Sequence, residues 1–350
     1  MRTPYALGLV VALACLTAGC SRTGTPRING GGSTFIEPLV NTWQPVYFKE
    51  ACVQVDYTGT GSGNGIQQMT KQALRFGCTD APMNDEQLDK ARKAGGDVVH
   101  VPLVMGGVVP IYNVPGVPGD THLKFTGPLL ADIYLGDVTK WDDPALKELN
   151  PGVTLPDLPI KVVSRSEPSG TTAIFAEFLA KSRPEAWAAK KMGKGTSVTF
   201  AVGVRAPKNP GVAGEVSRTE GAIGYVELTY AKLMKEKAGL GAVRNRAGKF
   251  LVASPDSVTA AAASLQDIPE DLTFSLVDTP GPDAYAISGA TWAVFYKKQP
   301  AAPGKALVDF LRWATAKDKG QQYGPELGYA PLPDALIQRI DARLKQVELQ

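Results

Sequence analysis

Predicted strands and helices alternate from residue 27 onward, and this alternation restricts the chain to a small set of folds. Short apolar segments predict strands at Arg27–Gly30, Val53–Tyr57, Arg75–Cys78 and Val98–Leu103. Amphipathic segments of helical length, Thr34–Glu50 and Gly63–Leu74, lie between them. Strands and helices that alternate at this spacing favour an α/β domain with a largely parallel sheet.

Both predicted helices carry apolar residues at helical spacing. The stripes comprise Phe35, Ile36, Leu39, Val40, Trp43, Val46 and Tyr47 in the first helix, and Ile66, Met69, Ala73 and Leu74 in the second. Residues that recur about every 3.6 positions share one helix face, so we expect these side chains in the core. Pro38 falls in the first turn, where a missing N–H is tolerated.

The chain has 350 residues, a length that favours two domains. The Val/Gly/Pro-rich segment Pro102–Gly119 marks the expected crossing into the second domain. There we predict helices at Ala131–Leu135, Pro144–Leu149 and Gly170–Lys181, and strands at Ile160–Ser164, Thr196–Val202 and Ala222–Val226. A strand at Tyr285–Tyr296 should return to the first domain, and helices at Lys305–Ala316 and Pro333–Gln346 should pack on it.

The N-terminus predicts export. Arg2 is followed by an apolar run from Ala6 to Leu16, which ends at Thr17-Ala18-Gly19-Cys20. The run is too short to span a bilayer, which takes about 20 residues, and is typical of a secretory signal. Small residues before a cysteine resemble a bacterial lipobox, with residues 1–19 removed, Cys20 lipidated and residues 20–26 as anchor and spacer. A plain signal peptide with a chance cysteine is the alternative.

Several functions are disfavoured by charge and by residue usage. The net charge is only +3, without massed Lys or Arg, so we expect no nucleic-acid partner. His100 and His122 lie far from any ligand cluster, so we expect no metal. Cys52 and Cys78 remain in the mature chain; a disulfide between them and two free thiols are both open.

Three segments share a strand, a turn rich in glycine and hydroxyl residues, and a helix. They are Gly30–Phe35, Gly59–Gly65 and Ser164–Thr171. A helix N-terminus presents unpaired N–H groups and partial positive charge, and glycines let an anion approach the backbone. Together they predict an oxyanion site. Taken singly, Ser62 or Ser169 is better explained as a helix N-cap.

Two charged residues refine this prediction. Arg165 offers a planar fork of donors suited to a tetrahedral oxyanion, and Glu167 could hold that fork in place. Asp80, in GCTDAP, would repel an anion unless the anion carries a proton for the carboxylate to accept. Phosphate carries such a proton near neutral pH, whereas sulfate does not, so Asp80 favours phosphate. A turn residue before Pro82 is the alternative for Asp80.

The chain resembles the periplasmic phosphate-binding subunit of bacterial ABC phosphate importers. The resemblance rests on GGGSTF, YTGTGSGNGI, FGCTDAPM, VMGGVV, DIYLGDVTKWDDPA, RSEPSGTT, GAIGYVE and GYAPLPDAL, in order from about Ile28 to the C-terminal helix. It implies an α/β, two-lobed class II binding-protein fold, each lobe a mixed sheet flanked by helices, with a ligand cleft between them. Residues 27–108 plus 286–350 would form the first lobe and residues 109–285 the second, with hinges near Gly106–Pro110 and Asp283–Ala286.

The resemblance also implies the ligand residues. The phosphate-binding set would be Thr34, Phe35, Ser62, Asp80, Arg165, Ser169, Gly170 and Thr171, supported by Ser33, Gly61 and Glu167. Glu167-Pro168 stands where the family more often has Asp-Gly.

The implied protein is not an enzyme. It would bind inorganic phosphate as a monomer without cofactors, contact the membrane only through the lipid anchor, and deliver phosphate to a membrane-embedded ABC permease from the periplasm or cell surface. The alternatives are a secreted phosphatase or serine hydrolase that uses Ser62 or Ser169, and a binding protein for sulfate or molybdate.

Overall fold

The computed structural model describes residues 25–118, 120–234, 237–265 and 267–350. The predicted signal segment and Cys20 lie outside these residues. The strands are β1 (Arg27–Gly32), β2 (Gln54–Gly59), β3 (Phe76–Thr79), β4 (Val98–Asn113), β5 (Lys124–Phe125), β6 (Lys161–Arg165), β7 (Val204–Ala206), β8 (Ala222–Glu227), β9 (Gly239–Leu240), β10 (Ala242–Arg244), β11 (Phe250–Leu251), β12 (Ser288–Tyr296), β13 (Lys298–Gln299) and β14 (Glu348–Leu349).

The helices occupy the segments between these strands. They are α1 (Glu37–Ala51), α2 (Ser62–Thr70), α3 (Asp85–Gly95), α4 (Gly127–Leu135), α5 (Pro144–Leu149), α6 (Gly170–Ser182), α7 (Pro184–Ala189), α8 (Lys208–Arg218), α9 (Leu228–Leu233), α10 (Pro255–Ala263), α11 (Ala301–Thr315), α12 (Gly324–Leu327) and α13 (Asp334–Leu344), with short 3₁₀ turns at Gly195–Ser197 and Gly320–Tyr323. None of the helices in the described ranges is long and apolar enough to cross a membrane.

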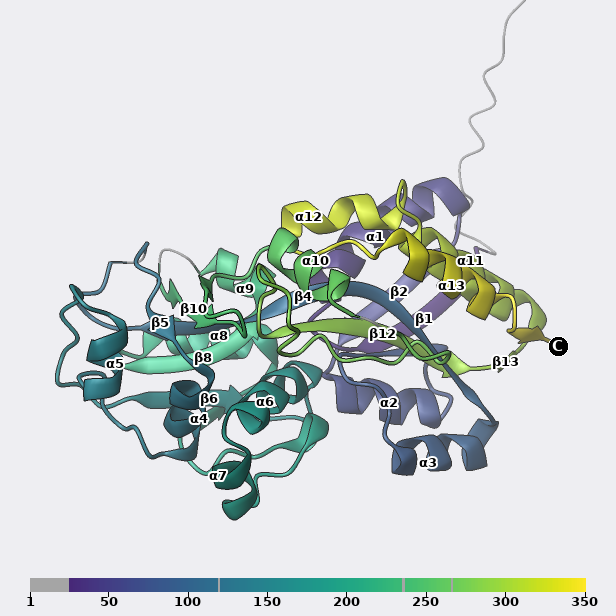
Figure 1. Cartoon of the computed structure of the whole chain (residues 1–350). Coiled ribbons are helices and arrows are strands. Elements are labelled where there is room, and N and C mark those ends of the chain that lie inside the picture. Colours follow the sequence, from purple (N-terminus) through teal and green to yellow (C-terminus); the bar gives the residue numbers. More distant parts are fainter. Residues whose placement is uncertain (1–24, 119, 235–236, 266) are drawn as a thin grey trace, which may run out of the picture.

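The main sheet is mixed. Its strand order is β2-β1-β3-β12-β4-β8-β6-β7, with β9 also paired to β4. The pairs β1–β2, β1–β3, β6–β8 and β6–β7 are parallel, whereas β12 and β4 run antiparallel to their neighbours. Figure 1 shows the middle of the chain on one side of the molecule and both ends of the described chain on the other.

Strand β4 contributes to both parts of the main sheet, because its two halves pair with different strands. Val98–Gly107 pairs with β12, and Val108–Asn113 pairs with β8. The predicted strand Val98–Leu103 is therefore too short, because Pro102, Gly106 and Gly107 lie within the ladder with β12 and the strand continues to Asn113. Pro102 is tolerated there because the ladder is irregular beside its partner Trp292.

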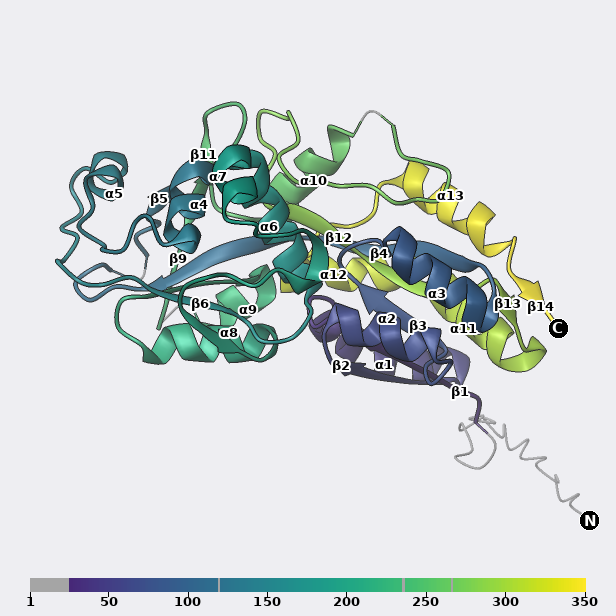
Figure 2. The same ribbon diagram turned by 90° about the horizontal axis from the view of Figure 1, so that it is seen from below.

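Helices cover both faces of the sheet. Helices α1, α11 and α13 lie on one face of the first part and α2 and α3 on the other, while α8 and α9 lie opposite α4 and α6 in the second part (Figures 1 and 2). Trp43 and Tyr47 of α1 pack against Phe310 and Trp313 of α11. The predicted packing of the C-terminal helices on the first α/β segment is confirmed by contacts of α11 with β1 and β4.

Other sequence predictions also differ from the structure. Helix α1 begins at Glu37 rather than Thr34, so residues 33–36 form a turn. Helix α2 ends at Thr70, and Ala73 beyond it is exposed. The predicted strand Thr196–Val202 is wrong: its alternating Val198 and Phe200 are buried, but Phe200 packs in an aromatic cluster with Tyr134 and Tyr225 instead of joining a ladder.

Cys78 carries a free, buried thiol, so it does not form a disulfide with Cys52. Cys78 lies in β3, between β1 and β12 in the sheet. Burial raises the pKa of this thiol well above its usual range. Cys78 is therefore a core residue rather than a cross-link.

Candidate functional site

The three hydroxyl-rich turns converge at the carboxyl ends of β1, β2, β3 and β6. The carboxyl ends of β1, β2 and β3 lie along one edge because these strands are parallel. Strand β6 runs in the opposite direction and approaches that edge from the other part of the sheet, because β12 and β8 pair with different halves of β4. Backbone bonds tie the turns together: Gly61 N–H donates to Gly32 O at 2.7 Å, and Gly63 N–H donates to Pro168 O at 3.1 Å. The left-handed φ of Gly32, 126°, suits glycine at the end of β1.

Asp80 lies at the centre of this cluster and is 3% exposed. Its Oδ1 accepts the hydroxyls of Ser33 and Thr291, the latter at 2.7 Å, and its Oδ2 accepts the Ser62 hydroxyl at 3.3 Å. Burial raises the pKa of Asp80 to about 6, against the hydroxyl bonds and the charge of Arg165. Neutral hydroxyl donors therefore hold the carboxylate in a site from which water is excluded. In such a site, a hydrogen bond donated by a protonated neighbouring group is strong.

Arg165 is the buried cation beside Asp80, with a side chain 1% exposed. Its Nε donates to Glu167 Oε1 at 3.0 Å, and Nη2 bonds the same oxygen. The fork also reaches Thr171 Oγ1 and Thr34 Oγ1, each at 3.3 Å. Glu167 itself accepts Lys208 N–H at 3.0 Å, so the Glu-Pro sequence still braces the guanidinium.

Helix α6 begins against Asp80. Gly170 N–H donates to the Ser62 hydroxyl oxygen at 3.0 Å, and a Cβ on Gly170 would lie 2.6 Å from Asp80 N. Only glycine fits this close approach. The Ser169 hydroxyl accepts Thr172 N–H at 3.2 Å, which makes Ser169 the N-cap of α6.

Thr34 and Phe35 form the turn between β1 and α1. Phe35 N–H donates to Ser33 Oγ at 3.0 Å. Both turn carbonyls are held by tyrosines: Tyr230 OH donates to Thr34 O at 2.9 Å, and Tyr329 OH donates to Phe35 O at 2.6 Å. The turn is therefore fixed from behind, with the Thr34 hydroxyl facing Arg165.

Two residues of the cluster were not predicted from the sequence. Thr291 on β12 bonds Asp80, and Asn209 on α8 donates from Nδ2 to Thr34 Oγ1 at 3.0 Å and Thr171 Oγ1 at 3.3 Å. Asn209 follows β7 at another strand-to-helix junction, in VRAPKNPG. That junction lacks glycine-hydroxyl pairs, and only its place between a strand and a helix could have indicated a role.

The cluster contains more acid than base. Asp80 and Glu167 stand against Arg165 alone, so an anion here would be stabilised by dipoles rather than by net positive charge. The N-termini of α2 and α6 both point into the cluster through Ser62 and Gly170. The arrangement suits a protonated oxyanion, whose O–H can face Asp80 while its other oxygens accept N–H and O–H donors.

The comparisons with known proteins agree on one family. A sequence profile described as the PBP superfamily domain matches residues 20–318. The phosphate-binding protein PstS of Xylella fastidiosa (strain Temecula1) is 39% identical over 325 residues, covering 92% of this chain and 85% of the relative. That of Pasteurella multocida is 36% identical over 326 residues, covering 92% and 91%. The chain belongs to the family of PstS phosphate-binding proteins.

Solved structures share the architecture. A periplasmic phosphate-binding protein, PfluDING, bound with phosphate, superposes with a TM-score of 0.72 at 23% identity, covering 90% of this chain and 93% of that one. This likeness and the family profile confirm the expected fold class, a two-lobed α/β binding protein.

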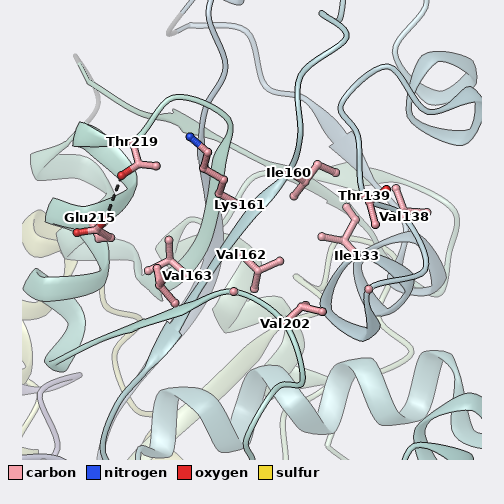
Figure 3. Close-up of a pocket in the computed structure, with 13 residues that line it drawn as sticks. Ile133, Val138, Thr139, Ile160, Lys161, Val162, Val163, Val202, Glu215 and Thr219 are labelled. Carbon is pink, nitrogen blue, oxygen red and sulfur yellow. Dashed lines mark hydrogen bonds between the residues drawn. The ribbon is translucent and has the colours of Figure 1, made fainter.

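A cavity beside β6 has a different character from the Asp80 cluster. Figure 3 shows a cavity of about 350 Å³ beside β6, lined largely by Ile133, Val138, Ile160, Val162 and Val202. The polar pair at its rim, Thr219 and Glu215, is joined by a 3.0 Å hydrogen bond. This apolar cavity contains none of the residues of the Asp80 cluster, so we assign no anion site to it.

Proposed function

We propose that the protein binds inorganic phosphate at the Asp80 cluster and delivers it to a membrane-embedded ABC permease. The observation that carries the proposal is the buried Asp80 carboxylate, surrounded by the Ser33, Ser62 and Thr291 hydroxyls. An ionised carboxylate only accepts hydrogen bonds, so it selects an anion that brings a proton. The family membership supports the ligand and the transport role.

The proposed ligand set draws on both lobes. Thr34, Phe35 and Ser62 would donate from the first lobe, and Arg165, Ser169, Gly170 and Thr171 from the second, with Asp80 accepting the phosphate proton. The bonds that join these residues to one another, such as Gly170 to Ser62, support the proposal because they bring the donors together. In the ligand complex, some of them would be exchanged for bonds to phosphate oxygens.

The proposed lobe boundaries are residues 27–108 with 286–350, and residues 109–285. The change of partner along β4, from Ser288 opposite Gly107 to Glu227 opposite Val108, supports a hinge near Gly106–Pro110. The second hinge, near Asp283–Ala286, is supported by its position just before β12. Phosphate would favour the closed arrangement, and the permease would bind that shape.

A non-enzymatic role is part of the proposal. A serine nucleophile needs a positioned base. The Ser62 hydroxyl donates to Asp80, a carboxylate that we assign to the phosphate proton rather than to a nucleophile, and Ser169 caps α6. His100 Nε2 accepts Met83 N–H and His122 Nδ1 contacts Leu240 O, so both imidazoles have structural partners.

We also propose that the protein acts outside the cytoplasmic membrane as a monomer anchored through Cys20. Cys20→Ser should release the protein from the membrane fraction, and unchanged membrane retention would contradict the anchor.

One purified sample tests binding against catalysis. Titration calorimetry should show saturable binding of inorganic phosphate at one site per chain, and the same sample should not release phosphate from an aryl phosphate ester. Absence of phosphate binding would refute the proposal. Hydrolysis that disappears in Ser62→Ala would favour the phosphatase alternative instead.

A further inference from the structure

Glu227 is a buried carboxyl at the point where β4 changes partner. It is the last residue of β8, pairs with Val108, and is fully buried. Its backbone N–H donates to Asn209 Oδ1 at 3.1 Å, and the amide of Asn209 contacts Thr34 and Thr171. The residue therefore connects the shared strand to both sides of the cluster.

The side chain of Glu227 has one committed donor. Thr229 N–H donates to Oε2 at 2.9 Å, the N-cap bond of α9. Two hydroxyls also lie near the carboxyl: Thr229 Oγ1 is 3.2 Å from Oε1, and Tyr329 OH is 3.4 Å from Oε2.

The protons of both hydroxyls have closer acceptors. Tyr329 OH lies 2.6 Å from Phe35 O, and Thr229 Oγ1 lies 3.0 Å from Leu327 O. A carbonyl oxygen can only accept, and each hydroxyl has one proton to give. If both protons go to the carbonyls, an ionised Glu227 would be buried with a single donor, which is costly. A neutral carboxyl instead donates its own proton to a hydroxyl lone pair.

The charges around Glu227 do little to favour ionisation. Burial raises the pKa of Glu227 to about 8, against the bonds from Thr229 and Tyr329 and the charge of Lys232 on α9. Tyr230 of α9 and Tyr329 beyond α12 also face it, and both remain neutral because burial raises their pKa. Glu37 of α1, Arg165 of β6 and Asp80 act on Tyr230. Within the described ranges, Lys232 is thus the one cation whose charge opposes the rise in the pKa of Glu227 that burial causes.

We propose that Glu227 is a neutral positioning residue whose carboxyl proton is donated to the Tyr329 hydroxyl, which in turn donates to the Phe35 carbonyl. This chain joins the end of β8 in the second lobe to the turn that carries Thr34 and Phe35 in the first. Its consequence for affinity rests on the proposed function, because that turn is assigned to phosphate. The protonation state of Glu227 does not depend on that assignment.

Infrared difference spectroscopy on the ligand-free protein tests the protonation state. At about pH 7 the wild type should show a neutral carboxyl C=O band that is missing in Glu227→Gln and retained in Glu215→Gln, a matched carboxyl on α8 outside the cluster. Absence of a band that depends on Glu227 would overturn the proposal. This result is independent of whether the chain binds phosphate.

Phosphate titrations test the positioning role. Glu227→Leu keeps the bulk but removes the donor, and should weaken phosphate binding roughly five- to tenfold, the effect of one buried hydrogen bond. Glu227→Gln, which can still donate, should recover most of that loss. Tyr329→Phe should weaken binding to a similar extent, and the double variant with Glu227→Leu should be no weaker than either single variant, because both break one chain.

Three outcomes are separable. If the wild type fails to bind phosphate, the proposed function is refuted. The protonation state of Glu227 is then tested by the infrared measurement alone. Wild-type binding with a Glu227→Leu affinity equal to that of wild type overturns the positioning role. Additive losses in the double variant overturn the chain through Tyr329.

Discussion

The Ser62 hydroxyl oxygen accepts the Gly170 backbone N–H at 3.0 Å, and this bond joins the N-termini of α2 and α6. The same hydroxyl lies 3.3 Å from Asp80 Oδ2. Two helix N-termini thus meet at one carboxylate, which balances their partial positive charges. An anion that enters between them must compensate for the nearby negative charge, and a bound proton does so.

Gly170→Ala should impair closure. The new Cβ would lie 2.6 Å from Asp80 N, too close for any real contact with backbone. Overpacking of this kind costs about 1–3 kcal/mol, so we expect phosphate affinity to fall roughly five- to hundredfold in titration calorimetry.

Gly214→Ala on α8 is the control for this glycine. There the nearest atom is the flexible Nη1 of Arg218 at 3.2 Å, and alanine favours the helix. The phosphate affinity of Gly214→Ala should stay at the wild-type value. If Gly170→Ala binds phosphate as tightly as the wild type does, then α6 and Asp80 do not approach each other in the complex.

Arg165 and Ser169 should behave differently on truncation. Arg165→Ala removes the one buried cation of the cluster and leaves Glu167 without its partner, so binding of every oxyanion should weaken by more than roughly a hundredfold. Ser169 caps α6 through Thr172 N–H, so Ser169→Ala should lower the melting temperature through a loss of about 1 kcal/mol. Calorimetry and thermal denaturation separate the two effects. An Arg165→Ala protein with wild-type affinity would contradict the assignment of the guanidinium.

Asp80 should make the ligand-free protein less stable as pH rises. Burial raises its pKa to about 6 in the folded protein, from an ordinary value of 3.8. A raised pKa contributes stability that is fully present below the unfolded value and is lost as pH rises through about 6. Relative to Asp80→Asn, the wild type should therefore lose thermal stability between about pH 4 and pH 7.

The control for the Asp80 titration is Asp157→Asn. Asp157 is an exposed partner of Lys140, and its pKa is lowered by that lysine, so it should not reproduce the decline. A constant difference in melting temperature between wild type and Asp80→Asn across this range would contradict the buried, raised-pKa carboxyl.

Local signals in the sequence account for much of the fold. Helix α5 has the predicted bounds Pro144–Leu149, and α6 begins at the predicted Gly170, because proline and N-cap residues mark helix starts locally. The crossing at Pro102–Gly119 was expected, but its form as one continuous strand, β4, was not, because Pro102 and the glycines usually interrupt a strand. Only pairing with β12, far along the chain, keeps that segment extended.

The candidate site shows the same division between local and distant information. Turns that carry Ser62, Arg165 and Thr171 could be identified because each lies within a few residues of a helix start. Thr291 is 211 residues from Asp80, and Asn209 is 175 residues from Thr34. A single hydroxyl in an apolar strand, or an asparagine after a proline-lysine turn, has no local feature that marks it as a neighbour of an anion site.

The most direct test of the central claim compares phosphate with sulfate in wild type and Asp80→Asn by titration calorimetry. Wild type should bind phosphate much more tightly than sulfate, because sulfate has no proton for the Asp80 carboxylate. Asp80→Asn should bind sulfate more tightly than wild type does, since the amide can donate and carries no charge, and the preference should shrink by roughly tenfold or more. Equal affinities of the wild type for both anions, or an unchanged preference in the variant, would contradict the role of Asp80.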